Sequence, residues 1–444
     1  MPAAIATSLC CLFILTLYFL NRDRNSRVSP ALWVPVIWVS ICASRMVSQW
    51  LGGVEEATKR DFEQGNSFDA AVFASLLVVG LVVLLGRGRR ARLAAILRKN
   101  KPLILFLLYC LVSVIWSDYP VVTFKRWIKA LGDLTMVLIV LTDFDPAASL
   151  GQFLARPGFT LVPLSILLIR YYPSLGREYS SWTGEAYNIG VATGKNSLGF
   201  ICLIVGLGCV WSLLDAIRAK KRPRAAGPIM AQVAILALTL WLFRMAQSAT
   251  SFICFMIGSG LIMATRLRLL ARKPVLVNLM VGMLLFVVLY GLLINPGVGL
   301  VEAVGRDSTL TGRTDIWKVV LPLTVNPLFG AGYESFWLGS RLDKIWSNSW
   351  GERPNQAHNG YLEVYLDLGW VGLVLLGLVM TWGYWGIVRT LRSYSTIGRL
   401  KLAFFVVAAI YNLTEHAFRD LHPVWIIFLL AVTVIPDSML QEVR

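Results

Sequence analysis

Apolar runs about as long as a bilayer is thick recur along the whole of this chain. A helix that crosses the hydrocarbon core needs about 20 predominantly apolar residues. With 57% hydrophobic and only 15% charged residues, the chain carries too much apolar surface for a soluble protein of 444 residues. We therefore expect an all-α polytopic membrane protein with about 12–13 transmembrane helices. The candidate spans are 4–20, 30–51, 68–86, 102–117, 127–142, 157–172, 196–214, 229–243, 249–265, 275–295, 361–388, 401–418 and 421–436.

The charges of the loops indicate how these spans cross the membrane. Lys and Arg outnumber Asp and Glu by 42 to 25, a formal net charge of +17. If the N-terminus lies outside, the basic runs fall in alternate loops, as the positive-inside rule requires of cytoplasmic segments. The excess charge thus reflects orientation in the membrane, and we expect no nucleic acid as a partner. The cytoplasmic runs are 22–27, 87–101, 218–224, 266–273 and 389–401.

One loop on the expected outer side, 296–359, is far longer than the usual connection of about 4–6 residues. It is rich in Trp, Tyr and Phe, and this composition favours folding over disorder. The stretch 313–325 predicts a short amphipathic helix, which Pro327 and a turn at Gly330 and Gly332 bring to an end. We expect a folded periplasmic cap, which divides the chain into N-terminal helices (1–295), the cap (296–359) and C-terminal helices (360–444).

All seven cysteines lie inside apolar segments, and their number is odd. Neither a disulfide framework nor a metal-ligand spacing is visible among them. We therefore expect no metal site and no cofactor, and we interpret the cysteines as small residues for helix packing. They are Cys10, Cys11, Cys42, Cys110, Cys202, Cys209 and Cys254.

The chain has three histidines, the residue type best suited to proton transfer near neutral pH. His358 ends the large outer loop, directly before a long apolar stretch, so that it would lie beside the cap. His416 and His422 lie near the outer ends of late spans. We expect the rings of His416 and His422 to lie at the membrane interface, each with a nitrogen toward water.

Basic residues on the outer side oppose the prevailing charge bias, so each is expected to have an anionic partner. Lys195 and Asn196 follow Gly194 at the start of a span, where the free N–H groups of a helix N-terminus favour an anion. Arg313 opens the amphipathic stretch of the cap, and its guanidinium suits bidentate binding of phosphate or carboxylate. A local ion pair of Arg313 with Asp315 is the alternative.

Charged residues within the spans are few, and they concentrate toward the outer surface. An intramembrane charge marks a functional site by default, and a transporter would carry more of them near the midplane. The distribution therefore favours a site at the outer interface over a path through the membrane. The main charges are Arg45, Lys129, Asp133, Arg170, Asp367 and Glu415.

Five short blocks near the expected outer face form a recognisable series. One runs from His358-Asn359 across nine residues to Gly369 and then Gly372; the others are Trp116-Ser117-Asp118-Tyr119-Pro120, 194–199, 312–317 and 326–333. In their order along the chain, these blocks resemble the superfamily of O-antigen ligases and O-antigen polymerases, particularly its exopolysaccharide repeat-unit polymerases. The first block is similar to the ligase signature of His, then Asn, Ser or Gln, nine residues, Gly, two residues, and Gly, Thr or Tyr.

The resemblance implies inverting, metal-independent glycosyl transfer from a polyprenyl-diphosphate-linked oligosaccharide to a sugar hydroxyl. His358 would be the general base that takes the proton of the acceptor hydroxyl. Arg313, with Lys195 and Arg244, would stabilise the negative charge of the departing diphosphate. The other residues expected to bind substrate are Asn196, Asn359, Tyr333 and Glu334.

One further block, 247–251, departs from the family pattern. Many members carry a basic residue within a Ser-Arg-Thr-like block, and Ala249 fills that place here. Arg244 lies on the preceding turn and is near enough to substitute.

We favour a polymerase that joins repeat units of exopolysaccharide or O-antigen, with a second lipid-linked unit as the acceptor. A ligase that transfers the glycan to lipid A core is the first alternative, and a flippase of lipid-linked sugars is the second. Many transporters carry internal repeats, whereas the large outer loop has no counterpart in the first half of this chain. Membrane lipids and a chain-length regulator complete the expected partners.

Overall fold

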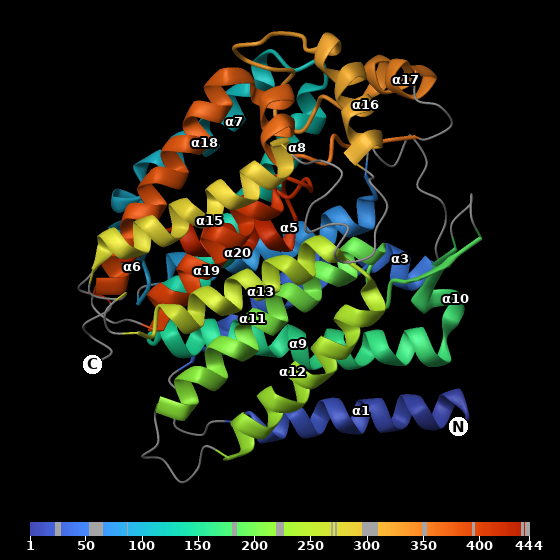
Figure 1. The fold of residues 1–444 in the computed structure, drawn as a ribbon, viewed down its shortest axis with the longest axis vertical. Coiled ribbons are helices and arrows are strands. Elements are labelled where there is room, and N and C mark those ends of the chain that lie inside the picture. The colour runs from blue at the N-terminus through green and yellow to red at the C-terminus, as the bar shows by residue number, and fades with distance from the viewer. Residues whose placement is uncertain are drawn as a thin grey trace.

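The computed structural model describes residues 1–22, 28–52, 65–86, 88–179, 184–218, 226–267, 270, 273–294, 310–348, 353–392, 396–436 and 439. Outside these ranges lie parts of the basic loops, such as 23–27 and 219–225, and the first part of the large outer loop, 295–309. Figure 1 shows the described helices gathered into one bundle.

Helices form nearly all of the described structure. Up to residue 171 the elements are α1 (Ala3–Leu20), η1 (Pro30–Leu32), α2 (Trp33–Cys42), α3 (Val47–Gly52), α5 (Ser67–Leu85), α6 (Arg90–Lys99), α7 (Lys101–Val112), η2 (Ser113–Ile115), α8 (Pro120–Leu141) and α9 (Pro146–Tyr171). From 173 to 294 they are α10 (Pro173–Gly176), β1 (Arg177–Tyr179), β2 (Ala186–Asn188), α11 (Lys195–Arg218), α12 (Ala226–Ala246), α13 (Ala249–Ala264) and α15 (Pro274–Ile294). The rest are α16 (Leu310–Val320), η4 (Leu321–Leu323), α17 (Gly339–Asn348), α18 (Gly360–Arg392), α19 (Thr396–Tyr411) and α20 (Pro423–Val432).

The expected all-α membrane architecture is confirmed. Six of the described helices, α1, α5, α9, α11, α12 and α18, are long and apolar enough to cross a membrane. Shorter apolar helices cover other expected spans, among them α13, α15 and α20. Most of the α9 span is buried inside the protein (72%), against 11% of α1, so α9 is central and α1 is peripheral.

Two expected spans, 30–51 and 401–418, are interrupted well before their expected ends. The span 30–51 is broken, because α2 ends at Cys42 and the backbone N–H of Arg45 donates instead to the carbonyl of Val191, at 3.1 Å. The span 401–418 ends earlier, because α19 stops at Tyr411. There the Asn412 side chain accepts hydrogen bonds of 2.9 Å from the N–H groups of Ala417 and Phe418, which closes a turn.

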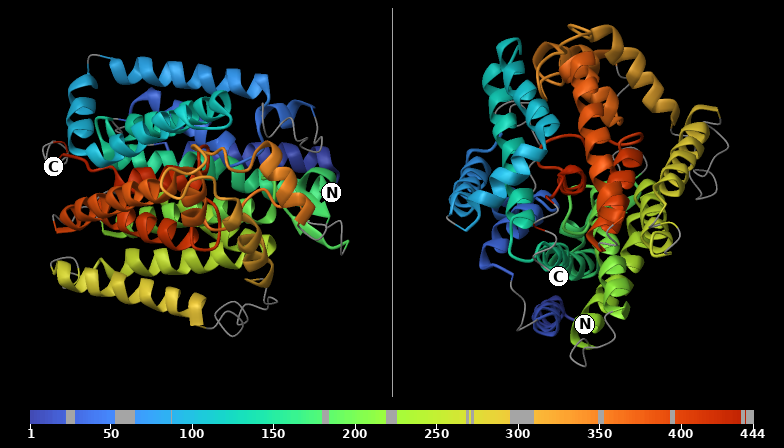
Figure 2. Two further views of the ribbon diagram at one scale, coloured as in Figure 1. Left: turned by 90° about the horizontal axis from the view of Figure 1, so that it is seen from above. Right: turned by 90° about the vertical axis from the view of Figure 1, so that its left-hand side faces the viewer.

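The hairpin of α19 and α20 lies at the centre of the bundle (Figures 1 and 2). Every residue of α20 and nearly every residue of α19 is buried. Such all-round burial explains why α20, and α19 from Leu402 to Tyr411, are apolar on all faces, without the polar stripe of a surface helix. The turn 412–422 between them is therefore held by packed helices on several sides.

The second half of the large outer loop packs on a break in α18. At Gly369 the backbone has φ 64° and ψ −164°, so the helical hydrogen bonding is interrupted. The loop supplies replacements, since the N–H of Gly332 donates to Asp367 O at 2.8 Å and the N–H of Trp370 donates to Pro327 O at 2.9 Å. A Cβ at Gly369 would lie 2.3 Å from the Leu328 backbone, so only glycine permits this approach.

The cap helices α16 and α17 lie beyond this loop, at the upper right of Figure 1. A small hydrophobic cluster, separate from the main core, joins them to the start of α18. Its buried members are Val320, Ala331, Phe336, Ile345, Ala357 and Leu366.

Candidate active site

The turn 412–422 carries two adjacent charged or titratable residues, Glu415 and His416, that face different surroundings. The start of α18 is fixed to this turn, because the N–H of Gly360 donates to Asn412 O at 2.8 Å and to Glu415 O at 3.1 Å. A Cβ at Gly360 would lie 2.0 Å from the Asn412 side chain, so the two segments touch directly. The end of the large loop is thus placed against the centre of the bundle.

The carboxylate of Glu415 gathers three side chains from three other segments. Its Oε1 lies 3.3 Å from Arg313 Nη2 and accepts a hydrogen bond of 3.1 Å from Asn196 Nδ2. Its Oε2 lies 3.6 Å from His358 Nδ1. We call Glu415, Arg313, Asn196 and His358 the Glu415 cluster. The structure therefore brings three of the site residues predicted from the sequence together around Glu415, which was not one of them.

The Glu415 cluster remains accessible on one side. The side chain of His358 is 31% exposed and that of Arg313 is 23% exposed. Because His358 Nδ1 is buried toward Glu415, the exposure belongs to the rest of the ring. His358 also has φ 52°, a left-handed backbone that a residue with a Cβ adopts only where its surroundings hold it.

Arg313 is tied to the turn and not to its own helix. Its Nη1 donates to the carbonyl of Thr414, and its Nη2 pairs with Glu415. The alternative of a local pair with Asp315 is wrong, since Asp315 pairs with Lys318 at 2.8 Å. A guanidinium has five N–H donors, so these contacts leave donors for an anion on the open side.

Lys195 lies beside the Glu415 cluster, at the first residue of α11. Its ammonium group lies 4.0 Å from the centre of the Tyr187 ring, a cation–π contact with β2. Strand β2 pairs antiparallel with β1, with Arg177 opposite Asn188. Asn196 is further held through Ser248, whose Oγ lies 3.5 Å from Asn196 Oδ1.

The structure does not bring Arg244 into the Glu415 cluster. Arg244 is exposed in the last turn of α12, and no contact with Glu415, Arg313 or His358 is found for it in the described part of the chain. The neighbouring block 247–251 does reach α11, because Gly199 approaches Ser248 so closely that a Cβ would lie 2.5 Å from its side chain.

A second group of side chains, His416 with Glu334 and Glu363, lies on the other side of the turn. His416 Nε2 is 3.8 Å from Glu334 Oε1, and His416 Nδ1 is 3.7 Å from Glu363 Oε1. We call these three residues the His416 cluster. His416 and Glu363 are closed off from solvent, with side-chain exposures of 5% and 1%, and Glu334 is 13% exposed.

The expectation that His416 and His422 lie at the membrane interface is wrong, because both face the interior. His416 is buried between two carboxyl groups. His422 accepts a hydrogen bond from the N–H of Val424 at its Nδ1, which caps α20, and its ring packs 4.8 Å from that of Phe200. Helix capping and core packing therefore explain His422.

The remaining predicted substrate-binding residues lie behind or beside the accessible face. Asn359 caps α18, since its Oδ1 accepts bonds of 3.0 Å from the N–H groups of Tyr361 and Leu362. Tyr333 is buried, and its N–H donates to Ser113 Oγ at 2.9 Å. Burial raises the pKa of the Glu334 carboxyl well above its usual range, and the nearby acidic groups raise it further.

Glu415 is the residue of this site that sequence reasoning missed. It was visible as a rare charge in an apolar stretch, but nothing local connected it with Arg313 or Asn196, which are 102 and 219 positions away. The described residues contain no group of three or more His, Cys, Asp or Glu side chains that could hold a metal ion.

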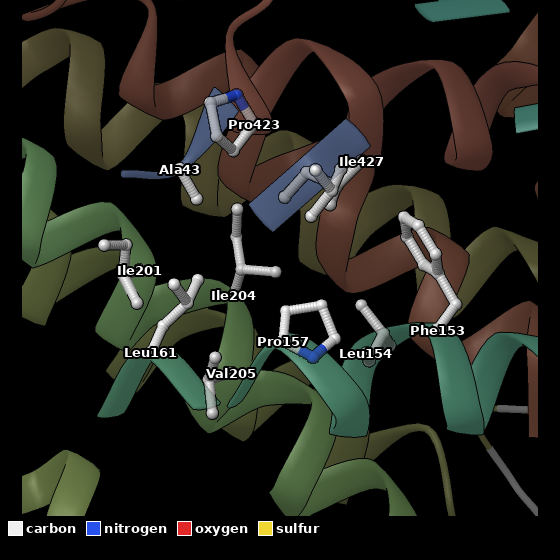
Figure 3. Close-up of a pocket in the computed structure, with 11 residues that line it drawn as sticks. Ala43, Phe153, Leu154, Pro157, Leu161, Ile201, Ile204, Val205, Pro423 and Ile427 are labelled. Atoms are coloured by element: carbon white, nitrogen blue, oxygen red, sulfur yellow. The ribbon is translucent and has the colours of Figure 1, made fainter. Parts of the chain in front are cut away.

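An apolar pocket lies deeper in the bundle, between α2, α9, α11 and α20 (Figure 3). Its lining includes Phe153, Pro157, Ile204 and Ile427, and its cavity volume is about 30 Å³. That volume is about the share of one water molecule in the liquid, so neither a sugar nor a lipid tail fits. This pocket is therefore too small to hold a substrate, and the Glu415 cluster remains the candidate site.

Part of the chain is similar to a known protein family. Residues 233–377 match the family model described as O-Antigen ligase. The chain is 27% identical over 319 residues to "Exopolysaccharide production protein ExoQ" of Rhizobium meliloti, covering 69% of each chain. It is 22% identical over 375 residues to a Rickettsia felis protein named "Putative polysaccharide ligase", covering 80% of this chain and 88% of that one. The matched region contains Arg244, Arg313 and His358, and it ends before Glu415.

Proposed function

We propose that this chain, of which residues 233–377 match the O-antigen ligase family model, is an inverting glycosyltransferase of lipid-linked oligosaccharides. Its donor would be a glycan on polyprenyl diphosphate and its acceptor a sugar hydroxyl. The observation that carries the proposal is the Glu415 cluster, where a partly exposed histidine and a partly exposed arginine share one carboxylate. Such a site offers a base and an anion-binding group on the same accessible face.

In the proposed reaction His358 is the general base. The acceptor oxygen attacks the anomeric carbon of the donor sugar, the bond from that carbon to the phosphate oxygen breaks, and His358 takes the acceptor's proton. Glu415 faces His358 Nδ1 and would stabilise the imidazolium that forms, as the carboxylate of a catalytic triad does. The contact of 3.6 Å is longer than a hydrogen bond, and such contacts commonly shorten only when substrate is bound.

Arg313 would hold the diphosphate of the donor. The departing group gains negative charge as the glycosidic bond breaks, and a fixed guanidinium lowers the barrier by stabilising that charge. Lys195, at the N-terminus of α11, would add to the same positive field. We propose no metal for the step, because the diphosphate is already activated as a leaving group.

For the acceptor we propose a second lipid-linked repeat unit, which makes the enzyme a polymerase. The exopolysaccharide production named for the Rhizobium relative supports this choice. A ligase that uses lipid A core is the second candidate, supported by the name of the Rickettsia relative. In either case the site would face the periplasm from the inner membrane, in agreement with the charge bias of the loops.

Purified protein incubated with a polyprenyl-diphosphate-linked repeat unit tests the proposal. We expect glycans of two or more units, an inverted anomeric linkage at the new bond, and release of polyprenyl diphosphate. A product that forms only when lipid A core is added would identify a ligase. Movement of the lipid across a vesicle without any new glycosidic bond would contradict glycosyl transfer altogether.

A further inference from the structure

Glu363 is a buried carboxylate in the first turn of α18 that the proposed reaction does not use. Its Oε2 accepts a hydrogen bond of 2.7 Å from the indole N–H of Trp337, and its Oε1 accepts one from the backbone N–H of Ala357. The same Oε1 lies 3.7 Å from His416 Nδ1. A carboxylate that is 1% exposed is unfavourable unless donors satisfy it, so these contacts hold it in one place.

Ala357 directly precedes His358 and is held from both sides. Its N–H donates to Glu363, and its carbonyl accepts a hydrogen bond of 2.8 Å from the indole of Trp317 in α16. The residue is completely buried. Glu363 and the indole of Trp317 therefore both bind the residue directly before His358, and the indole of Trp337 holds Glu363 in turn.

His358 requires such support because of its left-handed backbone, with φ 52°. On the other side of His358, the N–H of Gly360 is bound to the carbonyls of Asn412 and Glu415. Contacts through Glu363 and through the turn thus fix the two ends of the segment 357–360. The imidazole between them faces Glu415 as a result.

Asp367, one turn further along α18, provides a direct comparison. It is also buried, and its Oδ1 accepts hydrogen bonds of 3.1 and 3.0 Å from the N–H groups of Ser335 and Phe336. Both carboxylates anchor the large loop to α18 through backbone N–H groups. Only Glu363 anchors the peptide next to His358.

We propose that Glu363 is a positioning residue, which acts through Ala357 to place the His358 imidazole between Glu415 and the acceptor hydroxyl. This inference rests on the proposed function, in which His358 takes the acceptor's proton. Glu363 exchanges no proton with substrate, and its effect on the rate exists only while His358 is present. A displacement of about 1 Å at a reacting group costs about 10²-fold in rate, which sets the scale of the effect.

A double-mutant cycle on the purified protein tests this role. Glu363→Gln keeps the size of the side chain but places an amide N–H₂ among N–H donors. With the lipid-linked repeat unit as substrate, we expect kcat to fall about 10- to 100-fold and KM to stay within about twofold. In the His358→Ala background the same change should lower kcat no further, because nothing remains to be positioned.

Two more variants separate positioning from stability. Asp367→Asn removes a comparable anchor of the loop, so we expect a similar loss of thermal stability with kcat within about threefold of the parent. If Glu363→Gln does not fold, Trp317→Phe removes the hydrogen bond to the carbonyl of Ala357. It should give a smaller loss of kcat, again only where His358 is present.

Equal losses from Glu363→Gln in both backgrounds would overturn the inference, as would an unchanged kcat in Glu363→Gln. These results differ from the failure of the proposed function itself. In that case His358→Ala alone would turn over at the rate of the parent.

Discussion

The Glu415 and His416 clusters stem from adjacent residues of one turn, yet they differ in exposure and in bonding. In the Glu415 cluster the histidine and the arginine are about a quarter exposed and contact the carboxylate at 3.3 to 3.6 Å. In the His416 cluster Glu363 is 1% exposed and both of its oxygens accept hydrogen bonds. Accessible side chains with long contacts can adjust their positions to a substrate. Buried side chains whose polar atoms are all hydrogen-bonded instead keep the surrounding backbone in one conformation. We therefore propose that the Glu415 cluster carries the chemistry and that the His416 cluster supports it.

The largest expected effect concerns His358. His358→Ala should lower turnover about 10²- to 10⁴-fold, the usual loss when a general base is removed. Turnover of purified protein with the lipid-linked substrate measures it. His422→Asn is the matched control, since asparagine also caps helices well and His422 lies away from the Glu415 cluster. A comparable loss in His422→Asn would show that histidine replacement in this region acts through the fold.

Arg313→Lys should give the next largest effect. Lysine keeps the charge, but it lacks the planar guanidinium that can bind Thr414 O, Glu415 and a phosphate at the same time. We therefore expect kcat/KM to fall by at least about tenfold. Lys318→Ala, on the same helix, removes an exposed cation that pairs with Asp315. It should leave kcat/KM unchanged. Equal activity of Arg313→Lys and the parent would remove the guanidinium from the site.

A smaller difference separates Lys195 from Arg244, which the sequence placed in the same role. Lys195→Ala should raise KM for the lipid-linked donor a few-fold, roughly the effect of one lost charge near the site. Arg244→Ala should change it by less than about twofold, because Arg244 is exposed and apart from the Glu415 cluster. Steady-state kinetics at one ionic strength compare the two. The reverse order of effects would mean that Arg244 reaches the donor after all.

The smallest effect concerns the pH dependence of stability at Glu334. Burial raises the pKa of this carboxyl, so the folded state favours its neutral form. Its contribution is fully present below the unfolded pKa of about 4.3 and is lost as pH rises through the folded value. Glu334→Gln imitates the neutral form, so the Tm of the variant relative to the parent should rise between pH 5 and pH 8, by about a few degrees. A constant difference in Tm across this range would contradict the assignment.

Hydropathy predicted the spans well because the length of an apolar run is a local property of the sequence. The end of α19 at Tyr411 was not predictable in the same way. Residues 412–418 mix polar and apolar types, so hydropathy does not mark where the helix ends. In the structure the side chain of Asn412 closes the turn by binding the N–H groups of Ala417 and Phe418. That early end is what frees Glu415 and His416 to form the two clusters.

The site was predictable only in part. His358, Arg313 and Asn196 lie in blocks that resemble a known family, so each could be selected individually. Their shared partner Glu415 joins residues separated by up to 219 positions, and no local pattern reports such a contact. Conversely, Asn359 was selected with His358 because of its place in the same block, and its side chain caps α18.

Donor affinity and turnover, measured on one preparation of His358→Ala, test the central claim most directly. If His358 acts in the transfer step while the fold and Arg313 hold the donor, the variant should bind the lipid-linked donor with a Kd within about twofold of the parent. Its turnover should be lower by about 10²- to 10⁴-fold. Turnover equal to that of the parent, or a donor affinity lost together with turnover, would contradict the assignment of His358 as the base of the Glu415 cluster.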